Sequence, residues 1–408
     1  MSVLLELVAL FVFARLFGEV CERIHVPALI GEILAGVLLG PLVLKLVIAS
    51  DPILLVADLG IFFIVYEAGM EMTLRGVKRI IKESGAAVAA GSFILPFLLG
   101  FHVGLVFDYE LRVSLFLGLA LSLTALPVSV RILTDFGWLN TDVGQTIITA
   151  GLLCDIAGLI ILAMITNLSQ AVMVVDAFSL TVTVLKVLLF FLTLLTVERV
   201  LSLKERSLSK HIVAGSERLL SKGAAFSVPL IAVFAFALFA QFLGLHFIIG
   251  TFFGTVIVAE HLFPIREGRR VREAISTISR GFLAPIFFAY LGLLTVTFEW
   301  SLAPLFATLL VAAVAGKMAG SYAGARAAGF LSWSASVIAV GMNGRGAMEL
   351  VIALVGLNLG LISQGIFSVL VLIGLITTLM TPLMLRYLAG MAPAAKRSKP
   401  KPKKTPGG

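Results

Sequence analysis

The segment TIITAGLLCDIAGLIILAMIT, Thr146–Thr166, places a single acidic residue, Asp155, in the middle of an apolar stretch. A stretch of about 20 mostly apolar residues is long enough to cross a bilayer as a helix. If that helix begins at Val143, Asp155 lies about 18 Å along an axis that rises about 1.5 Å per residue, near the centre of a bilayer core of about 30 Å. A carboxylate at this depth has a high insertion free energy, which indicates that it serves a function.

The composition of the whole chain agrees with that segment. Of 408 residues, 60% are hydrophobic and only 13% are charged, and the mean hydropathy is +1.09. Soluble domains are about 45–50% apolar and about 25% charged, so these values exclude a soluble enzyme and a disordered chain. The apolar runs are continuous rather than alternating, which excludes a β-barrel. Cys21 and Cys154 lie in or beside apolar runs, so we expect no disulfide.

Apolar runs separated by polar breaks predict an all-α polytopic membrane protein with about thirteen transmembrane helices. The expected spans are residues 2–23, 27–48, 52–73, 86–107, 112–135, 143–167, 176–200, 223–243, 246–262, 280–298, 301–323, 334–358 and 363–388. The shortest break is at Gly244, where a turn at Leu243–Leu245 splits one long apolar run.

Basic residues cluster in alternate loops of this arrangement, and the net charge is +8. The clusters lie at residues 75–82, 199–222 and 266–272, on the same side as the Lys-rich tail. The positive-inside rule then predicts a multi-pass protein of the cell membrane with an outside N-terminus and a cytoplasmic C-terminus. Residues 391–408 are Pro- and Lys-rich, which predicts a disordered basic tail that is a solvated anchor or a contact for anionic lipids.

Small residues recur at helix-packing spacing in two of the spans. Gly316, Gly320 and Gly324 are four residues apart in the eleventh span, and Gly36 and Gly40 are four apart in the second. This spacing favours close contact between helix backbones within lipid.

Asp155 has small neighbours, Gly151 and Gly158, which leave room for another backbone or for an ion. A carboxylate at mid-membrane holds a proton or a hard monovalent cation but hardly both, and that is the minimal chemistry of exchange. The alternative is a protonated structural aspartate that is bonded to a neighbouring helix.

The span before Asp155 contains a predicted helix break in LSLTALPVSVRIL, Leu121–Leu133. Ser122, Thr124 and Pro127 interrupt it, and Pro127 lacks the N–H that would complete the helical ladder, so carbonyls near Leu123 are freed. Transporters line ion sites with such unwound segments, although a simple proline kink is the alternative.

A second break is predicted in GMNGRGAMELVIALVG, Gly341–Gly356, at Asn343, Gly344 and Gly346. Arg345 and Glu349 are four residues apart and can pair on one helix face. We favour a structural ion pair that neutralises the ends of a broken helix. An offset of about 219 residues relates the two breaks, which indicates an inverted repeat with two crossed discontinuous helices.

Lys317 lies among small residues in the eleventh span, so we expect it to face protein rather than lipid. A buried ammonium group needs a carboxylate partner or must lose its proton. The alternative is a lysine that extends to the cytoplasmic interface.

Together these segments resemble the monovalent cation:proton antiporter superfamily in its Kef- and Nap-like branch, which includes Na⁺/H⁺ exchangers. The similar segments are VPALIGEILAGVLLGP at Val26–Pro41, EAGMEM at Glu67–Met72, SLTALPVSVRIL at Ser122–Leu133, the Asp155 segment, Gly316–Lys317 and GRGAMELVIA at Gly344–Ala353. The resemblance implies a homodimer with the Na⁺/H⁺ antiporter fold, no cofactor, and transported Na⁺ or K⁺ and H⁺. It implies a transmembrane domain over residues 1–390, in which a mobile core of roughly 52–167 and 280–388 moves like an elevator against a dimerisation domain.

The resemblance also implies roles for single residues. Asp155 matches the aspartate that binds the ion or the proton, and Thr124 matches the unwound-helix residue beside it. We expect Asp155 and Thr124 to bind the Na⁺ or K⁺, and Ser122 and Cys154 to belong to the same ion- and proton-binding site. Lys317, Arg345 and Glu349 would tune the charge of the core, and Pro127, Asn343, Gly344 and Gly346 would break the helices.

Cys154 is a departure from the family pattern, because electrogenic members often carry a second aspartate at this position. A neutral thiol cannot form a salt bridge with Lys317. If Lys317 stays protonated, Asp155 exchanges one proton for one cation, so we expect electroneutral exchange. We expect Cys154 to be a packing residue rather than a redox sensor, because reactive thiols need exposure.

Three other functions compete with cation:proton exchange. The first is a Kef-like K⁺ efflux system, which would need a separate regulatory subunit. The second is a sodium-coupled solute symporter, which Lys317 disfavours. A membrane enzyme is disfavoured because the chain has no HExxH and no Cys/His metal spacing.

Overall fold

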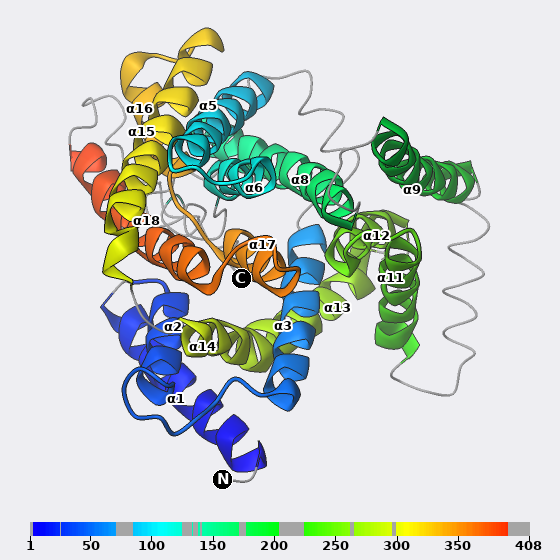
Figure 1. The fold of residues 1–408 in the computed structure, drawn as a ribbon. Coiled ribbons are helices and arrows are strands. Elements are labelled where there is room, and N and C mark those ends of the chain that lie inside the picture. The colour runs from blue at the N-terminus through cyan, green and yellow to red at the C-terminus, as the bar shows by residue number, and fades with distance from the viewer. Residues whose placement is uncertain are drawn as a thin grey trace, which may run out of the picture.

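The computed structural model describes residues 3–24, 26–70, 85–124, 133, 138, 141–170, 177–203, 224–261, 265–295 and 299–390 (Figure 1). All regular elements in these ranges are helical. They are α1 (Val3–Arg23), α2 (Ala28–Leu39), α3 (Asp51–Met70), α5 (Gly85–Val106), α6 (Leu111–Ser122), α8 (Asp142–Gln170), α9 (Ala177–Leu203), α11 (Ala224–Phe242), α12 (Phe247–His261), α13 (Ile265–Ile278), the π-helix η1 (Ser279–Leu283), α14 (Ala284–Leu294), the 3₁₀ helix η2 (Trp300–Leu302), α15 (Ala303–Ala327), α16 (Ser332–Met342), α17 (Ala347–Asn358) and α18 (Gln364–Gly390).

Several of these helices are suited to a membrane. Within the described ranges, six are long and apolar enough to cross one, and α16 and α17 together, bent by 41° at a short break, would make a seventh. Shorter apolar helices include α2, α6 and α12. The prediction of an all-helical protein with several apolar spans is therefore confirmed, whereas the count of thirteen remains a prediction.

The predicted split at Gly244 is present. Helix α11 ends at Phe242 and α12 begins at Phe247, and Gly244 has a φ of 78°. This left-handed conformation suits glycine, which has no Cβ to clash with the backbone. Glycine therefore allows the chain to turn between two antiparallel apolar helices.

The predicted span 27–48 is wrong in its length. Helix α2 ends at Leu39, and the chain then turns back, with the Val47 N–H donating to the Leu39 carbonyl at 3.0 Å. Pro41 has no N–H and disfavours the helical conformation in the preceding residue, Gly40. Lys45 then adopts a positive φ of 54°, so the apolar run continues while the helix does not.

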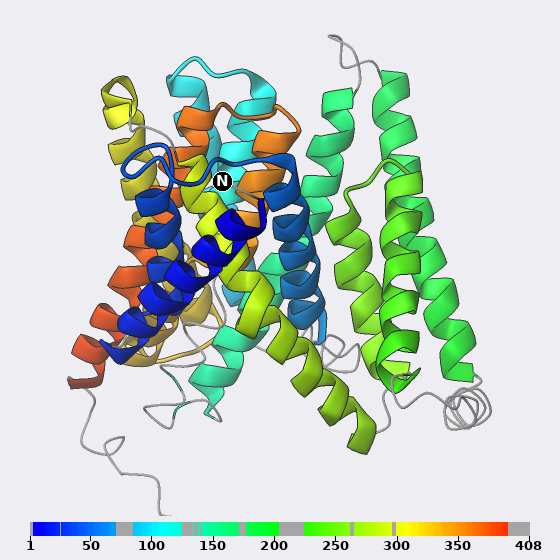
Figure 2. The same ribbon diagram turned by 90° about the horizontal axis from the view of Figure 1, so that it is seen from below.

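The helices pack in two groups (Figures 1 and 2). One group contains α5, α6, α8 and α15–α18, and the other contains α1–α3 and α11–α14, in which α13, η1 and α14 follow one another without a gap. Helix α9 contacts α8 of the first group and α12 of the second. Helix α3 packs mainly on α12, α14 and η1, in the second group. One hydrogen bond between the groups joins the Gln364 Nε2 of α18 to the Leu294 carbonyl of α14 at 3.0 Å.

Glycines set the closest helix contacts, as their spacing predicted. A Cβ added to Gly320 would lie 2.0 Å from the Gly91 carbonyl oxygen of α5, and one added to Gly324 would lie 2.4 Å from that of Ala87. A Cβ added to Gly36 would lie 1.8 Å from the Ala289 carbonyl oxygen of α14. These backbones touch only because the side chains are absent, as in other tightly packed membrane helices.

Candidate functional site

The C-terminal end of α6 is the centre of the site. The helix ends at Ser122, and Leu123 is extended with φ −74° and ψ 161°. The last carbonyls of a helix have no donor within it and carry its negative partial charge. The prediction of freed carbonyls near Leu123 is therefore confirmed. Pro127, to which the sequence analysis attributed the break, lies outside the described residues.

Two cationic side chains donate hydrogen bonds to these carbonyls. Arg345 donates from Nη1 to the Ala120 oxygen at 3.0 Å and from Nη2 to the Leu121 oxygen at 2.8 Å. Lys317 Nζ donates to the Ser122 oxygen. Both side chains are fully buried, at 0% exposed. The sequence predicts that Lys317 has a carboxylate partner or loses its proton. In the structure its ammonium group also has a backbone acceptor, the Ser122 carbonyl at the negative end of α6.

The second break brings Arg345 to this position. Residues Asn343–Gly346 separate α16 from α17, and a threonine of α18, Thr378, donates to the Arg345 carbonyl. The predicted pair is present, because Arg345 Nη1 lies 3.0 Å from Glu349 Oε1. Glu349 lies in the first turn of α17, where the helix dipole favours a negative charge. The ion pair therefore compensates the ends of two half-helices at once.

Asp155 lies on α8 beside this arrangement. It is 5% exposed, and its charge interacts with the Lys317 ammonium and the Cys154 thiol. The Thr124 side chain neighbours Cys154 and is 3% exposed. The Asp155 carboxylate and the Thr124 hydroxyl, which both lie close to Cys154, are oxygen groups of the kind that hard alkali cations prefer.

Other predicted site residues have different contacts. Ser122 Oγ lies 2.7 Å from the Gly118 oxygen and 3.1 Å from the Phe93 oxygen, which share its one hydrogen, so it holds α6 to α5. A Cβ on Gly158 would lie 2.4 Å from Leu123 Cδ2, so Gly158 accommodates a side chain of the break rather than an ion.

The glycines and the asparagine of the second break also have defined surroundings. Gly344 faces Thr381 of α18. Gly346 is extended before α17. Asn343 is fully buried, and its amide atoms have no partner among the described residues. The three residues therefore separate α16 from α17 within the interior of the first helix group.

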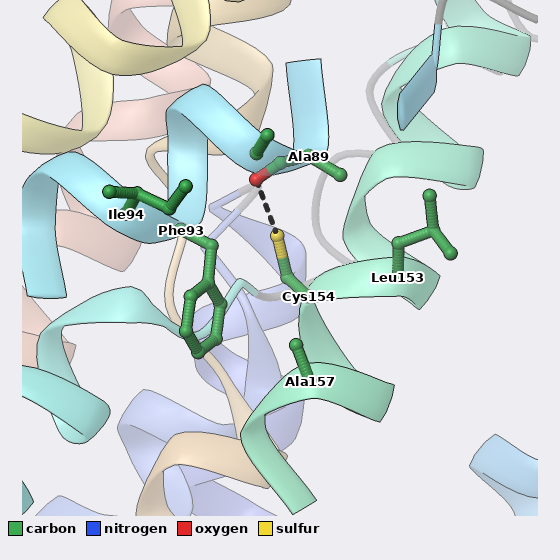
Figure 3. Close-up of a pocket in the computed structure, with 7 residues that line it drawn as sticks. Ala89, Phe93, Ile94, Leu153, Cys154 and Ala157 are labelled. Carbon is green, nitrogen blue, oxygen red and sulfur yellow. Dashed lines mark hydrogen bonds between the residues drawn. The ribbon is translucent and has the colours of Figure 1, made fainter. Parts of the chain in front are cut away.

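Cys154 borders a small cavity between α5 and α8 (Figure 3). The cavity has a volume of about 260 Å³ and is lined by Ala89, Ala90, Phe93, Ile94, Leu153, Cys154 and Ala157. The thiol points away from α8 toward the Ala89 carbonyl, 3.8 Å away. Sequence reasoning missed α5 as part of the site, because its Ser92 is an ordinary serine in an apolar helix.

Comparison with known proteins decides the family. The chain matches the family described as "Sodium/hydrogen exchanger, transmembrane" over residues 8–389. It belongs to that family. The resemblance inferred from the sequence is thereby confirmed. The exchanger is a secondary transporter and not an enzyme, and membership in this family also disfavours the solute symporter considered above.

Individual relatives match nearly the full length of this exchanger. The Na⁺/H⁺-K⁺ antiporter GerN of Bacillus cereus is 30% identical over 400 residues, which cover 96% of this chain and 98% of GerN. The Na⁺/H⁺ antiporter NhaS4 of Synechocystis is 30% identical over 414 residues, covering 94% of this chain and 96% of NhaS4. The structure of MjNhaP1 from Methanocaldococcus jannaschii has a TM-score of 0.67 at 15% identity, covering 96% of this chain and 98% of that one, which shows a common fold.

Proposed function

We propose that the protein exchanges Na⁺, or K⁺ in its place, for H⁺, with Asp155 carrying either the cation or the proton. The observation that carries this proposal is the buried Asp155 carboxylate in one site with the Thr124 hydroxyl and the Lys317 ammonium. The printed names of the relatives support the ions, since GerN is a Na⁺/H⁺-K⁺ antiporter and NhaS4 a Na⁺/H⁺ antiporter.

The charges around Asp155 favour one-for-one exchange. Arg345 and Glu349 neutralise each other at 3.0 Å. Lys317 Nζ donates to the Ser122 carbonyl at the negative end of α6, and that end of a helix favours a positive charge. If Lys317 keeps its proton throughout, replacing the Asp155 proton by a monovalent cation leaves the charge of the loaded site unchanged. Exchange is then electroneutral.

The two helix groups supply the moving parts of this proposal. The group with α5, α6, α8 and α15–α18 carries the site and acts as the mobile core. The core predicted from the sequence spans roughly 52–167 and 280–388, but the packing of α3 and α14 favours placing both of them in the other group. The core slides like an elevator against that group, which forms the homodimer interface, in a cell membrane with the C-terminus on the cytoplasmic side.

Flux in proteoliposomes tests the proposal. A pH jump with Na⁺, Li⁺ or K⁺ should drive cation-dependent proton movement in the wild type, and Asp155→Asn should abolish it with every cation. Asp142→Asn is the matched control, because Asp142 lies in the first turn of the same helix and is exposed. Robust exchange by Asp155→Asn would contradict the assignment.

The same assay distinguishes cation:proton exchange from the Kef-like K⁺ efflux system. A K⁺ efflux system would pass K⁺ without movement of protons, whereas an exchanger couples the two fluxes. Clamping the membrane voltage with valinomycin and K⁺ should leave the Na⁺-driven rate unchanged if the exchange is one-for-one.

A further inference from the structure

Helix α5 contributes a side chain to the site that the preceding sections do not use. Ser92 is fully buried, and its Oγ lies 3.2 Å from Cys154 Sγ on α8. Cys154 precedes Asp155 in the chain, so this contact joins α5 to the helical turn that carries the ion-binding carboxylate. Building on the proposed function, we infer that Ser92 is a positioning residue of the cation site and acts on Asp155 through the Cys154 thiol.

The hydrogen bonds around Ser92 join three groups of α5 and α8, and Thr124 also neighbours the Cys154 thiol. Ser92 Oγ lies 3.2 Å from the Ala89 carbonyl oxygen, and Cys154 Sγ lies 3.8 Å from the same oxygen. A carbonyl oxygen only accepts, while the hydroxyl and the thiol each have one hydrogen to donate. Both hydrogens are used when the serine hydroxyl and the cysteine thiol each donate one hydrogen bond. Helix α5 therefore offers acceptors to a neutral donor side chain at position 154.

Pro96 explains how α5 brings these groups to the site. Proline has no N–H, so the Ser92 carbonyl four residues earlier receives no helical hydrogen bond from it. The next carbonyl, of Phe93, accepts the Ser122 hydroxyl at 3.1 Å, and Pro96 Cα lies 3.0 Å from the Cβ position of Gly316. This turn of α5 therefore contacts α6, α8 and α15, which together carry the site.

The cavity beside Cys154 increases the importance of the hydrogen bond to Ser92. Ile94, Leu153 and Ala157 border an open space of about 260 Å³ next to the thiol (Figure 3). This hollow opens to the surface of the helix bundle, where Ile94 is 54% exposed, so the protein packs less closely on this side of the thiol. The bond to Ser92 supplies the constraint that packing lacks on this side of α8.

Substitution of Ser92 should therefore change the affinity for the cation. Removal of one hydrogen bond changes an equilibrium constant by about threefold to tenfold. In Ser92→Ala we expect the Na⁺ concentration for half-maximal exchange to rise by that factor while the maximal rate is retained. Ser92→Cys keeps a donor and an acceptor and should recover most of the affinity.

A matched control and a double variant distinguish a role of Ser92 in positioning Asp155 from a general loss of protein stability. Ser114→Ala also removes a fully buried serine hydroxyl, which donates to the Tyr109 oxygen at 3.2 Å near the opposite end of α6, and should leave the affinity unchanged. If Ser92 acts through the thiol, Ser92→Ala should add nothing in a Cys154→Ala background. Unchanged affinity in Ser92→Ala, equal loss in Ser114→Ala, or additive losses in the double variant would each overturn the inference.

A readout without transport keeps the inference separate from the proposed function. In a Cys21→Ser background, Cys154 is the only cysteine of the chain. A small uncharged maleimide adds to its thiol: the sulfur–carbon bond forms across the reagent's double bond and the thiol proton goes to the neighbouring carbon. Because Ser92→Ala releases the thiol toward the cavity, labelling should be several-fold faster, measured by intact-protein mass. An unchanged labelling rate would refute the link even in a protein that transports nothing, whereas absent wild-type exchange refutes only the proposed function.

Discussion

Arg345 holds two broken helices together through a single guanidinium group. It is the largest fully buried side chain among the described residues, and it donates to Ala120, Leu121 and Glu349. A planar guanidinium has five donors in a fixed geometry, so it can serve two carbonyls and a carboxylate together. Lysine, with one flexible ammonium group, could not reproduce this set.

We therefore predict that Arg345→Ala destabilises the protein strongly. The variant leaves the Glu349 carboxylate buried without its cation, and breaking a buried ion pair in this way costs about 3–5 kcal/mol. Thermal unfolding of the purified protein in detergent measures the effect. Arg326→Ala, which removes an exposed arginine bonded to one carbonyl oxygen, is the control and should change little. Arg345→Met combined with Glu349→Leu should unfold closer to the wild type than Arg345→Ala alone.

Position 154 decides the charge of the site. We predict that Cys154→Asp makes transport voltage-sensitive, because a second carboxylate next to Lys317 gives its ammonium a partner whose charge changes during the cycle. Two protons can then move for each cation. Exchange rates measured at several clamped voltages test this prediction, with Cys154→Asn as the neutral variant of the same shape. An unchanged voltage response in Cys154→Asp would contradict the role given to Lys317.

At the scale of elements, α5 and α15 form the rigid base on which the site rests. Their backbones meet at Gly91 and Gly320, and Lys317 lies one turn from this contact on α15. The distance between the two helices therefore determines whether Lys317 can reach the end of α6.

We predict that Gly320→Val abolishes transport and lowers the unfolding temperature. A Cβ at this position would lie 2.0 Å from the Gly91 oxygen, so the helices must separate, and overpacking of this kind costs about 1–3 kcal/mol. Proton flux and thermal unfolding measure the two effects. Gly390→Val is the control, because no atom of the described residues lies within 4 Å of its Cβ position. Normal flux in Gly320→Val would show that the spacing of these helices is not critical.

Sequence patterns predicted the features that depend on neighbouring residues in the chain. The turn at Gly244, the break at Asn343–Gly346 and the Arg345–Glu349 pair all follow from glycine chemistry or from a spacing of four residues. The end of α2 at Leu39 was missed, since hydropathy continues past Pro41 although helical hydrogen bonding does not.

Contacts between distant segments could not be predicted in the same way. The Ser122 carbonyl as acceptor for Lys317 and the Ser92 hydroxyl as partner of Cys154 join residues 195 and 62 positions apart. Backbone carbonyls are identical at every residue, so no sequence pattern marks the one that will receive a side chain. Such partners become visible only when α5, α6, α8 and α15 are packed together.

At the scale of the whole molecule, the contacts within each helix group are far more extensive than those between the groups. One group contains every described residue assigned to the ion site, and the other contains α1–α3 and α11–α14. Sliding of one body past the other would therefore disturb few contacts. The hydrogen bond from Gln364 to the Leu294 carbonyl is among those that such a movement must break.

We predict that a cross-link between these two positions stops transport. Leu294→Cys with Gln364→Cys, in an active background whose two native cysteines are replaced by serine, should be joined by a short bifunctional thiol reagent with a reducible bond. If the groups slide, cation-driven proton flux should disappear on cross-linking and return on reduction. Phe11→Cys with Phe282→Cys is the control, since these rings lie 5.2 Å apart within the second group and their cross-link should leave the flux intact. Full transport in the cross-linked Leu294–Gln364 pair would mean that the two groups move as one body, and that the site opens to the two sides by rearrangement within the first group.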